Sequence, residues 1–323
     1  LGLIEWVDNT TVLQDFLDDG MSEDERKRFY YKSGASIVRT KFLQWEKSSN
    51  LYSALYQKKS RKECVEKYQE LVNLVPKNLL VKSFLKLSSS PEAFMILRTK
   101  YAQSHAVICL SQWVIGIGDR HLGNFLIDKS SGCEVGIDFG HAFGSATQFL
   151  PVPELVPFRL TPQYLQLMSP LGVKGIYEST MIHTLSALCN RRDLLLSVMD
   201  IFIKEPTINW KANANKQLQD LHMSSEGKKE DWFPQQRIAI ARKKLEGVNP
   251  CIIMRKELEL GHSSKGELFK CMESVCLGNS EFNIRAKMKK TGLTVEEQVD
   301  CLIDLATDPH NLCLIYFGWN PWF

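Results

Sequence analysis

The sequence lacks the features that define several common classes of protein. No run approaches the ~20 apolar residues of a membrane-spanning helix, because the most apolar stretch, 106–117, is interrupted by Ser111 and Gln112. The net charge is only +3 and the basic runs are short, which does not indicate nucleic-acid binding. We therefore expect no membrane association and no direct nucleic-acid contact from this chain.

Paired cysteines and clustered metal ligands are also absent from the sequence. The nine cysteines form no Cys-x-x-Cys pair, and the seven histidines do not cluster with them, which argues against a zinc site. An odd and scattered set of cysteines is typical of reduced thiols in a cytosolic or nuclear protein. A hydrophobic fraction of 44% allows a sizeable core.

The patterning that is present is mainly helical. Ser22 and Glu25 form a capping-box pattern, which predicts a helix over 22–43. A Ser-Pro-Glu start predicts a long helix over 90–115, whose second half is apolar on nearly all sides and is expected to be buried. Further helices are expected over 12–17, 62–75, 175–204, 233–245 and 294–308.

A small β-hairpin is the second predicted feature. Two short strands, 125–127 and 135–137, lie on either side of a polar turn. Asn124 and Asp138 flank this hairpin, so their side chains are expected to lie close together. Another strand is expected over 1–7, before a second polar turn. The predicted fold class is mostly α with a small β-hairpin at the active site.

Two short motifs at this hairpin carry a recognisable chemistry. Residues 116–124 have the sequence Gly-Ile-Gly-Asp-Arg-His-Leu-Gly-Asn, and Ile-Asp-Phe-Gly follows over 137–140. Phosphoryl transfer from Mg-ATP needs a carboxylate that orients the hydroxyl nucleophile and oxygen ligands that hold Mg²⁺. We interpret Asp119 as a candidate catalytic base, and Asn124 and Asp138 as candidate metal ligands.

The two motifs and several other stretches resemble the phosphatidylinositol 3-kinase-related protein kinases. In ordinary protein kinases a histidine precedes the catalytic aspartate, whereas His121 follows Asp119 here. Residues 294–323 resemble the short FATC tail of this family, including the sequence Gly-Trp-Asn-Pro-Trp near their end. The other matching segments are 104–162, 209–211, 247–250 and 283–286. The chain is therefore similar to the C-terminal lobe of a phosphatidylinositol 3-kinase-like kinase fold.

The resemblance implies a role for each motif residue. Asp119 resembles the catalytic base, and His121 resembles a second catalytic residue near the transferred phosphate. Asn124 and Asp138 resemble the ligands of Mg²⁺. The implied cofactor is Mg-ATP.

The resemblance also implies an adenine pocket. Trp6 would pack on the adenine ring, and main-chain groups near Val7 would bind its edge. Leu126 and Ile137 would form the floor of the pocket. On general grounds a single Trp is more often a core residue than a ligand contact, so this role depends on the resemblance.

The resemblance divides the chain into a hinge (1–11), a kinase C-lobe (12–245), a regulatory segment (246–293) and the FATC tail (294–323). Within the C-lobe it places the catalytic loop at 116–124, the metal motif at 138–140 and the activation loop at 138–162. Residues 263–290 are weakly patterned, so we expect this segment to be mobile. The Gly-rich loop and lysine-bearing strand of a kinase do not occur in this sequence. We therefore expect the small lobe to lie outside it and the chain alone to be inactive.

The function that the resemblance implies is that of a nuclear serine/threonine protein kinase. Its substrates would be proteins in which Ser or Thr is followed by Gln. Its process would be the repair of DNA double-strand breaks by non-homologous end joining. The Ku heterodimer and DNA ends would bind to parts of the protein outside this chain.

Two alternatives to a protein kinase remain. A phosphoinositide lipid kinase would need clustered Lys or Arg in the activation loop to bind a phosphorylated headgroup, but 141–162 contains only Arg159. An isolated fragment of this kind would be a catalytically silent interaction module. For Trp319, Trp322 and Phe323, packing against the apolar side chains of 141–162 is favoured over membrane insertion, because no basic amphipathic helix accompanies them.

Overall fold

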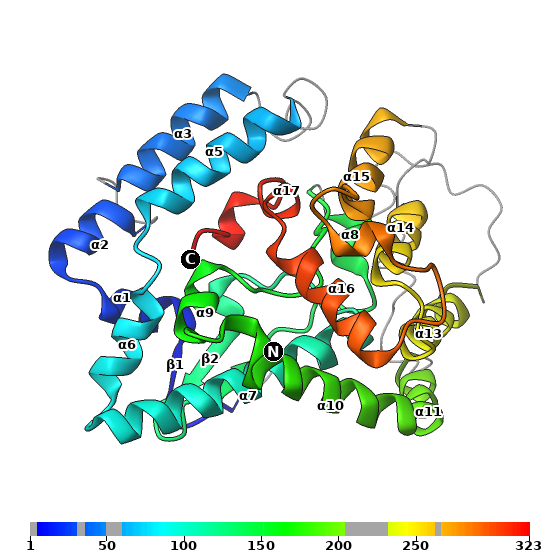
Figure 1. Ribbon diagram of the computed structural model, residues 1–323, viewed down its shortest axis with the longest axis horizontal. Helices are drawn as coiled ribbons and strands as arrows, with labels where there is room; N and C mark the ends of the chain where they lie inside the picture. The colour runs from blue at the N-terminus through cyan, green and yellow to red at the C-terminus, as the bar shows by residue number, and fades with distance from the viewer. Residues whose placement is uncertain (1–4, 31–35, 50–59, 151, 204–231, 262–265) are drawn as a thin grey trace.

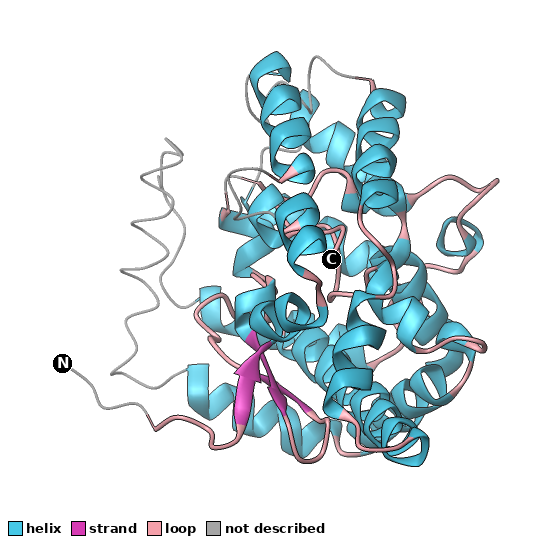
Figure 2. Ribbon diagram, turned by 90° about the vertical axis from the view of Figure 1, so that its left-hand side faces the viewer, coloured by secondary structure: helices cyan, strands magenta, loops and turns pink. Residues whose placement is uncertain are grey.

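Helices make up most of the molecule, as the sequence predicts (Figure 1). The computed structural model describes residues 5–30, 36–49, 60–150, 152–203, 232–261 and 266–323. Within these ranges the only sheet has three antiparallel strands, which lie at one side of the helices (Figure 2). The matching segment 209–211 falls outside the described residues.

Helix α7 (Pro91–Ile115) confirms the long helix predicted from the sequence. The Ser90 side chain accepts a hydrogen bond from the Ala93 amide, and Pro91 occupies the first turn, where its missing N–H is not needed. Helix α10 (Ile176–Asn190) runs along α7 (Figure 1). The C-terminal end of α7 leads directly into the predicted catalytic loop.

The sheet pairs β1 (Thr10–Val12), β2 (Phe125–Asp128) and β3 (Glu134–Gly136) in that order. The β2–β3 hairpin confirms the prediction. The strand predicted over 1–7 is wrong for the described residues 5–7, which have no strand pairing. The strand instead begins at the predicted polar turn, because three consecutive β-branched residues there pair with β2.

The helices that precede α7 are α1 (Leu13–Gly20), α2 (Glu23–Phe29), α3 (Ile37–Ser49), α5 (Arg61–Leu74) and α6 (Leu79–Leu87). The predicted capping box is present: Ser22 Oγ accepts from the Glu25 amide, and the Glu25 carboxylate accepts from the Ser22 amide. The single helix predicted over 22–43 is wrong. Helix α2 is short, and Ser36 starts α3 by accepting a hydrogen bond from the Arg39 amide.

The larger helices after α10 are α11 (Arg192–Ile203), α13 (Trp232–Leu245), α14 (Pro250–Gly261), α15 (Glu267–Leu277) and α16 (Val295–Thr307). The helix predicted over 175–204 is therefore two helices, whereas the one predicted over 233–245 is confirmed as α13. The weakly patterned segment 263–290 contains α15, whose buried side chains include Phe269 and Met272.

Short helical turns complete the described elements. They are α8 (Ser145–Phe149), α9 (Pro162–Leu167), α17 (Pro309–Leu312) and the 3-10 turns η1 (Leu122–Asn124), η2 (Gly172–Lys174), η3 (Ile284–Lys287) and η4 (Phe317–Trp319). The predicted activation loop thus contains a short helix, α8, and leads into α9. Among the described residues, no helix is long and apolar enough to cross a membrane.

Residues 294–323 cross the centre of the molecule and pack against its core (Figure 1). Helix α16 begins at the predicted capping box of Thr294 and Glu297, and its apolar face is buried. Trp319, Trp322 and Phe323 are each only 2% exposed. Their predicted packing in the kinase core is therefore confirmed, whereas their packing against the apolar side chains of 141–162 stays a prediction.

Candidate active site

The loop that follows α7 is fixed to the activation loop by its main chain. Gly116 ends α7 in the left-handed region with φ 76°, and its carbonyl accepts from the Gly144 amide at 2.8 Å. A Cβ at Gly116 would lie 2.6 Å from that amide nitrogen, so this approach requires glycine. The Gly118 amide donates to the His141 carbonyl at 2.8 Å. The two loops are therefore paired before the motif residues begin.

The predicted motif residues meet at the open end of the β2–β3 hairpin. The Ile137 amide donates to the Asn124 carbonyl at 3.0 Å, which continues the strand pairing toward Asp138. The Asn124 side-chain Nδ2 donates to the Asp119 carbonyl at 2.7 Å. Asp119, Asn124 and Asp138 are thus brought together, as their positions in the sequence predict.

Arg120, whose side chain the sequence does not assign to the site, fixes this arrangement from behind. Its guanidinium is 1% exposed and donates to the carbonyls of Gly118 at 2.9 Å, Ile137 at 2.8 Å and Asp138. Burial lowers the pKa of Arg120, and the surrounding carboxylates oppose that change. Asp119 and Asp138 both have positive φ, 58° and 56°, so their main chains are held in a conformation that non-glycine residues seldom adopt.

His121 is half-buried beside Asp119, and its hydrogen bonding defines its neutral tautomer. Its Nδ1 accepts a hydrogen bond from the Gly123 amide at 3.0 Å. Burial lowers the pKa of His121, and the positive charges of Arg159 and Arg120 act in the same direction. The neutral ring therefore carries its proton on Nε2, which makes Nε2 a hydrogen-bond donor.

A buried acid lies directly behind the predicted base. The Asp119 amide donates to both carboxylate oxygens of Glu154, each at 3.0 Å. The pKa of Glu154 is raised to about 7, mainly by burial and also by the charge of Asp119, against the lowering effect of the hydrogen bond from the Asp119 amide and of the charges of Arg120 and Arg159. The Asp119 main chain is thus held on both sides, by Glu154 at its amide and by Asn124 at its carbonyl.

The oxygen atoms at this end of the hairpin fit a hard divalent cation. Because Asn124 donates through Nδ2, its Oδ1 faces away from that bond and can serve as a ligand. The Asp138 side chain is exposed, and one of its oxygens accepts from the Gly140 amide at 3.2 Å while the other is open. Two oxygen ligands of this type are what Mg²⁺ uses when phosphates complete its coordination.

The four residues of the predicted adenine pocket lie in separate parts of the described structure. Trp6 and Val7 are 56% and 46% exposed, in the extended segment before β1. Leu126 is buried in β2, and Ile137 follows β3 and is partly exposed. No contact described in the structure joins Trp6 to Leu126 or Ile137, so the adenine pocket stays a prediction.

Comparison with known proteins finds two protein-family models that match the chain. The phosphatidylinositol 3- and 4-kinase model matches residues 1–212, and the FATC domain model matches residues 292–323. The chain belongs to the phosphatidylinositol 3- and 4-kinase family. The predicted kinase C-lobe fold and FATC tail are therefore confirmed.

The curated relatives of the chain within this family are much longer proteins. The DNA-dependent protein kinase catalytic subunit of Xenopus laevis is 44% identical over all of this chain and 8% of its own length. The protein of the same name from Dictyostelium discoideum is 40% identical over 99% of the chain and 8% of its own length. The serine/threonine-protein kinase tel1 of Schizosaccharomyces pombe is 30% identical over 99% of the chain and 10% of its own length. The chain thus spans about a tenth or less of the length of these relatives.

The FATC tail reaches the catalytic loop of this kinase-family chain through Arg159. The fully buried Arg159 guanidinium donates to the carbonyls of Trp319, Asn320 at 3.2 Å and Phe323 at 2.9 Å. Its Nε donates to the Arg120 carbonyl at 3.0 Å, and its guanidinium lies 3.8 Å from the centre of the Trp319 ring. One side chain therefore joins the activation loop, the catalytic loop and the FATC tail.

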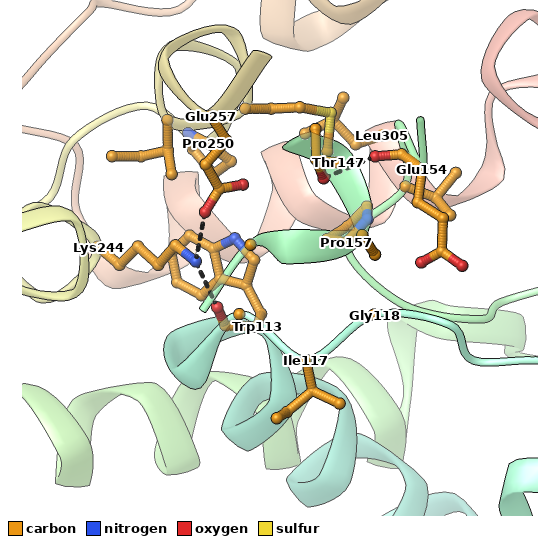
Figure 3. A pocket seen from close by; sticks show the side chains of 16 residues that line it. Trp113, Ile117, Gly118, Thr147, Glu154, Pro157, Lys244, Pro250, Glu257 and Leu305 are labelled. Carbon is orange, nitrogen blue, oxygen red and sulfur yellow. Dashed lines mark hydrogen bonds and ion pairs between the residues drawn. The ribbon is translucent and has the colours of Figure 1, made fainter. Parts of the chain in front are cut away.

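A pocket lies beside the predicted catalytic loop, between the C-terminal end of α7 and the helices α8, α13, α14 and α16 (Figure 3). At its wall the buried Lys244 donates to the Trp113 carbonyl at 2.7 Å and pairs with Glu257 at 3.2 Å. A positive charge at that carbonyl is favourable because it lies at the C-terminal end of α7. This contact fixes α13 and α14 to the helix that leads into the predicted catalytic loop.

Sequence reasoning did not find Arg120, Glu154 or the structural use of Arg159. One signal was available, because Glu154 is the only acidic residue and Arg159 the only Lys or Arg in 141–162. A single charge in an otherwise apolar loop indicates a buried and partnered group more often than a surface one.

Proposed function

We propose that this chain is the catalytic C-terminal part of a serine/threonine protein kinase, which transfers the γ-phosphoryl group of Mg-ATP to Ser or Thr followed by Gln. The observation that carries the proposal is the hydrogen bonding between the two motifs, 116–124 and 137–140. Asn124 binds the Asp119 main chain, and Arg120 binds the Asp138 main chain, in a chain that belongs to this kinase family. These contacts support the proposal because they bring the candidate base and the two candidate metal ligands to one end of one hairpin.

Each residue has a specific task in this proposal. The Asp119 carboxylate orients the substrate hydroxyl and accepts its proton. His121, neutral and protonated at Nε2, donates a hydrogen bond toward the transferred phosphoryl group. Asn124 Oδ1 and Asp138 would hold Mg²⁺, which would neutralise negative charge on the phosphates. The exposed Trp6 and the floor residues Leu126 and Ile137 would bind adenine.

A protein substrate is favoured over a lipid headgroup by the use of Arg159. It is the only Lys or Arg in 141–162, and its guanidinium is fully buried against main-chain carbonyls. No cationic side chain of the described activation loop is therefore available to bind a multiply phosphorylated headgroup. This leaves a peptide hydroxyl as the substrate class.

The wider role is proposed from the relatives. It is that of a nuclear kinase in double-strand-break repair by non-homologous end joining, with the Ku heterodimer and DNA ends bound by other parts of the protein. A kinase holds ATP between two lobes, and the phosphate-anchoring lysine is not among these residues. We therefore propose that residues 1–323 alone do not transfer phosphate.

The test replaces the base in the full-length kinase. Asp119→Asn should lower turnover on a Ser-Gln peptide by about two to four orders of magnitude, while ATP binding is retained. Asp193→Asn, an exposed aspartate on α11, is the matched control and should behave as the wild type. Near-normal turnover of the Asp119 variant would contradict the assignment.

A further inference from the structure

Glu154 is a buried acid whose position is set by the activation loop. Its side chain is 7% exposed, and both carboxylate oxygens lie 3.0 Å from the Asp119 amide nitrogen. Its own carbonyl accepts from Thr147 Oγ1 at 2.9 Å, which ties it to α8. In Figure 3 it lies across the pocket from Lys244 and Glu257. The carboxylate thus reaches from the activation loop to the main chain of the predicted base.

The Asp119 main chain needs such a partner. With φ 58°, Asp119 is in the left-handed region, which is unfavourable for a non-glycine residue unless its surroundings hold it there. The hydrogen bond from its amide to the Glu154 carboxyl group is one contact that holds it. The neighbouring Gly118 permits the approach, because a Cβ there would lie 2.2 Å from Ala146 Cβ and 3.0 Å from the Glu154 carboxylate.

A structural role alone does not account for a glutamate here. Among the described residues, no Lys or Arg lies within ion-pair distance of Glu154, so its charge is buried without a direct counter-ion. Arg120 and Arg159 act on it only from a distance, and the charge of Asp119 opposes its ionisation. A well-packed apolar side chain would stabilise the fold at least as well. The group that benefits from the carboxylate is the Asp119 amide.

We propose that Glu154 is a positioning residue that holds the Asp119 main chain in its active conformation and makes that conformation depend on an ordered activation loop. This inference rests on the proposed role of Asp119 as the base. Any rearrangement of the turn between Thr147 and Glu154 would withdraw the acceptor from the Asp119 amide. The base would then shift, while the main chains of Asn124 and Asp138, which the hairpin and Arg120 hold, would stay in place.

The experiment compares three variants in the full-length kinase, with Mg-ATP and a Ser-Gln peptide. Glu154→Ala should lower kcat about 10- to 100-fold, as expected for a base displaced by ~1 Å. The KM for ATP should stay within about twofold of the wild type, since the hairpin and Arg120 still hold the main chains of both metal ligands. Glu154→Gln keeps an oxygen acceptor and should recover most of the loss. Glu259→Gln, partly exposed on α14 and away from the pocket lining, is the matched control and should keep the wild-type kcat.

The outcomes separate this inference from the proposed function. The inference would be overturned if Glu154→Ala kept the wild-type kcat. It would also be overturned if Glu154→Gln lost as much kcat as Glu154→Ala, or if Glu154→Ala raised the KM for ATP and did not lower kcat. If the alanine variant does not fold, Glu154→Met fills the same space without an acceptor and should show the same loss of kcat. Turnover that survives Asp119→Asn would instead overturn the proposed function itself.

Discussion

The exposed face of the candidate active site and the buried layer behind it are built from different kinds of contact. On the exposed face, Asp138, Phe139 and Gly140 are open to solvent. In the layer behind, the Arg120 and Arg159 side chains are almost fully buried, and nearly all of their hydrogen bonds go to main-chain carbonyls. The exposed side chains that would contact substrate therefore contribute little to the packing of the core. Their positions depend on the buried side chains of Arg120 and Arg159, which substrate does not contact.

The buried layer also explains how segments far apart in the sequence act on one loop. The Arg159 side chain donates to the carbonyls of Phe323 in the FATC tail and of Arg120 in the predicted catalytic loop. The Arg120 side chain in turn donates to the carbonyl of Asp138. His105 adds to the same layer, because it lies between the Glu134 carboxylate at 2.7 Å and the Arg159 carbonyl at 3.0 Å. Since both partners are acceptors, His105 is doubly protonated, and its pKa is raised to about 10 against the effect of burial.

Removing a ligand from the exposed face should have the largest effect on activity and little effect on the fold. Asp138→Ala leaves the main-chain bonds to Arg120 intact but removes one of two oxygen ligands. We expect Mg-ATP binding to weaken roughly 10- to 100-fold, as for other losses at metal sites, and transfer to be abolished. Isothermal titration of the full-length protein measures this. Asp128→Ala, at the other end of the same hairpin, is the control, and unchanged Mg-ATP affinity in Asp138→Ala would refute the metal assignment.

Removing a charge from the buried layer should affect stability as well as activity. Arg159→Met preserves much of the volume but removes the guanidinium that donates to the carbonyls of Arg120, Trp319 and Phe323. We expect a loss of about 3–5 kcal/mol in the free energy of unfolding, as for other broken buried polar networks. Urea denaturation gives the value. Arg192→Met, half-exposed on α11, should change stability by less than about 0.5 kcal/mol, and equal effects of the two variants would contradict the comparison.

The carboxylate of Glu154 should give the buried layer a pH dependence. Its pKa is about 7 in the folded protein against 4.5 in the unfolded chain, so the folded state binds the extra proton between these values. Wild-type stability relative to Glu154→Gln should therefore fall as pH rises from about 4.5 to 7, by on the order of 3 kcal/mol in total. Thermal midpoints of both proteins at pH 5 and pH 8 test this. A difference between them that does not change with pH would contradict it.

The parts of the fold that the sequence predicts are those with local causes. The capping boxes at Ser22 and Thr294 each depend on a residue three positions away, and the predicted and observed bonds agree. The meeting of Asn124 with Asp138 follows from one hairpin. These features need no knowledge of the rest of the molecule.

The parts that the sequence does not predict depend on distant partners. Strand β1 forms because β2 offers it an edge, and the break after α2 depends on where Ser36 caps α3. Arginine is usually a surface residue, so the sequence does not indicate that Arg120 and Arg159 are buried. Their burial is favourable because carbonyls from several segments, including the FATC tail, accept their hydrogen bonds. Their roles become evident only once those carbonyls are placed.

The most direct test of the account is hydrogen exchange in the full-length kinase after deletion of 319–323. Because the buried layer holds the exposed face, the deletion should raise hydrogen exchange in peptides covering 152–162 and 116–124. Kinase activity should fall, while most of the fold is kept. Asp119→Asn, which changes only the exposed face, should leave exchange in both segments unchanged. Unchanged exchange in 152–162 after the deletion, or binding to lipid vesicles that depends on 319–323, would contradict the account.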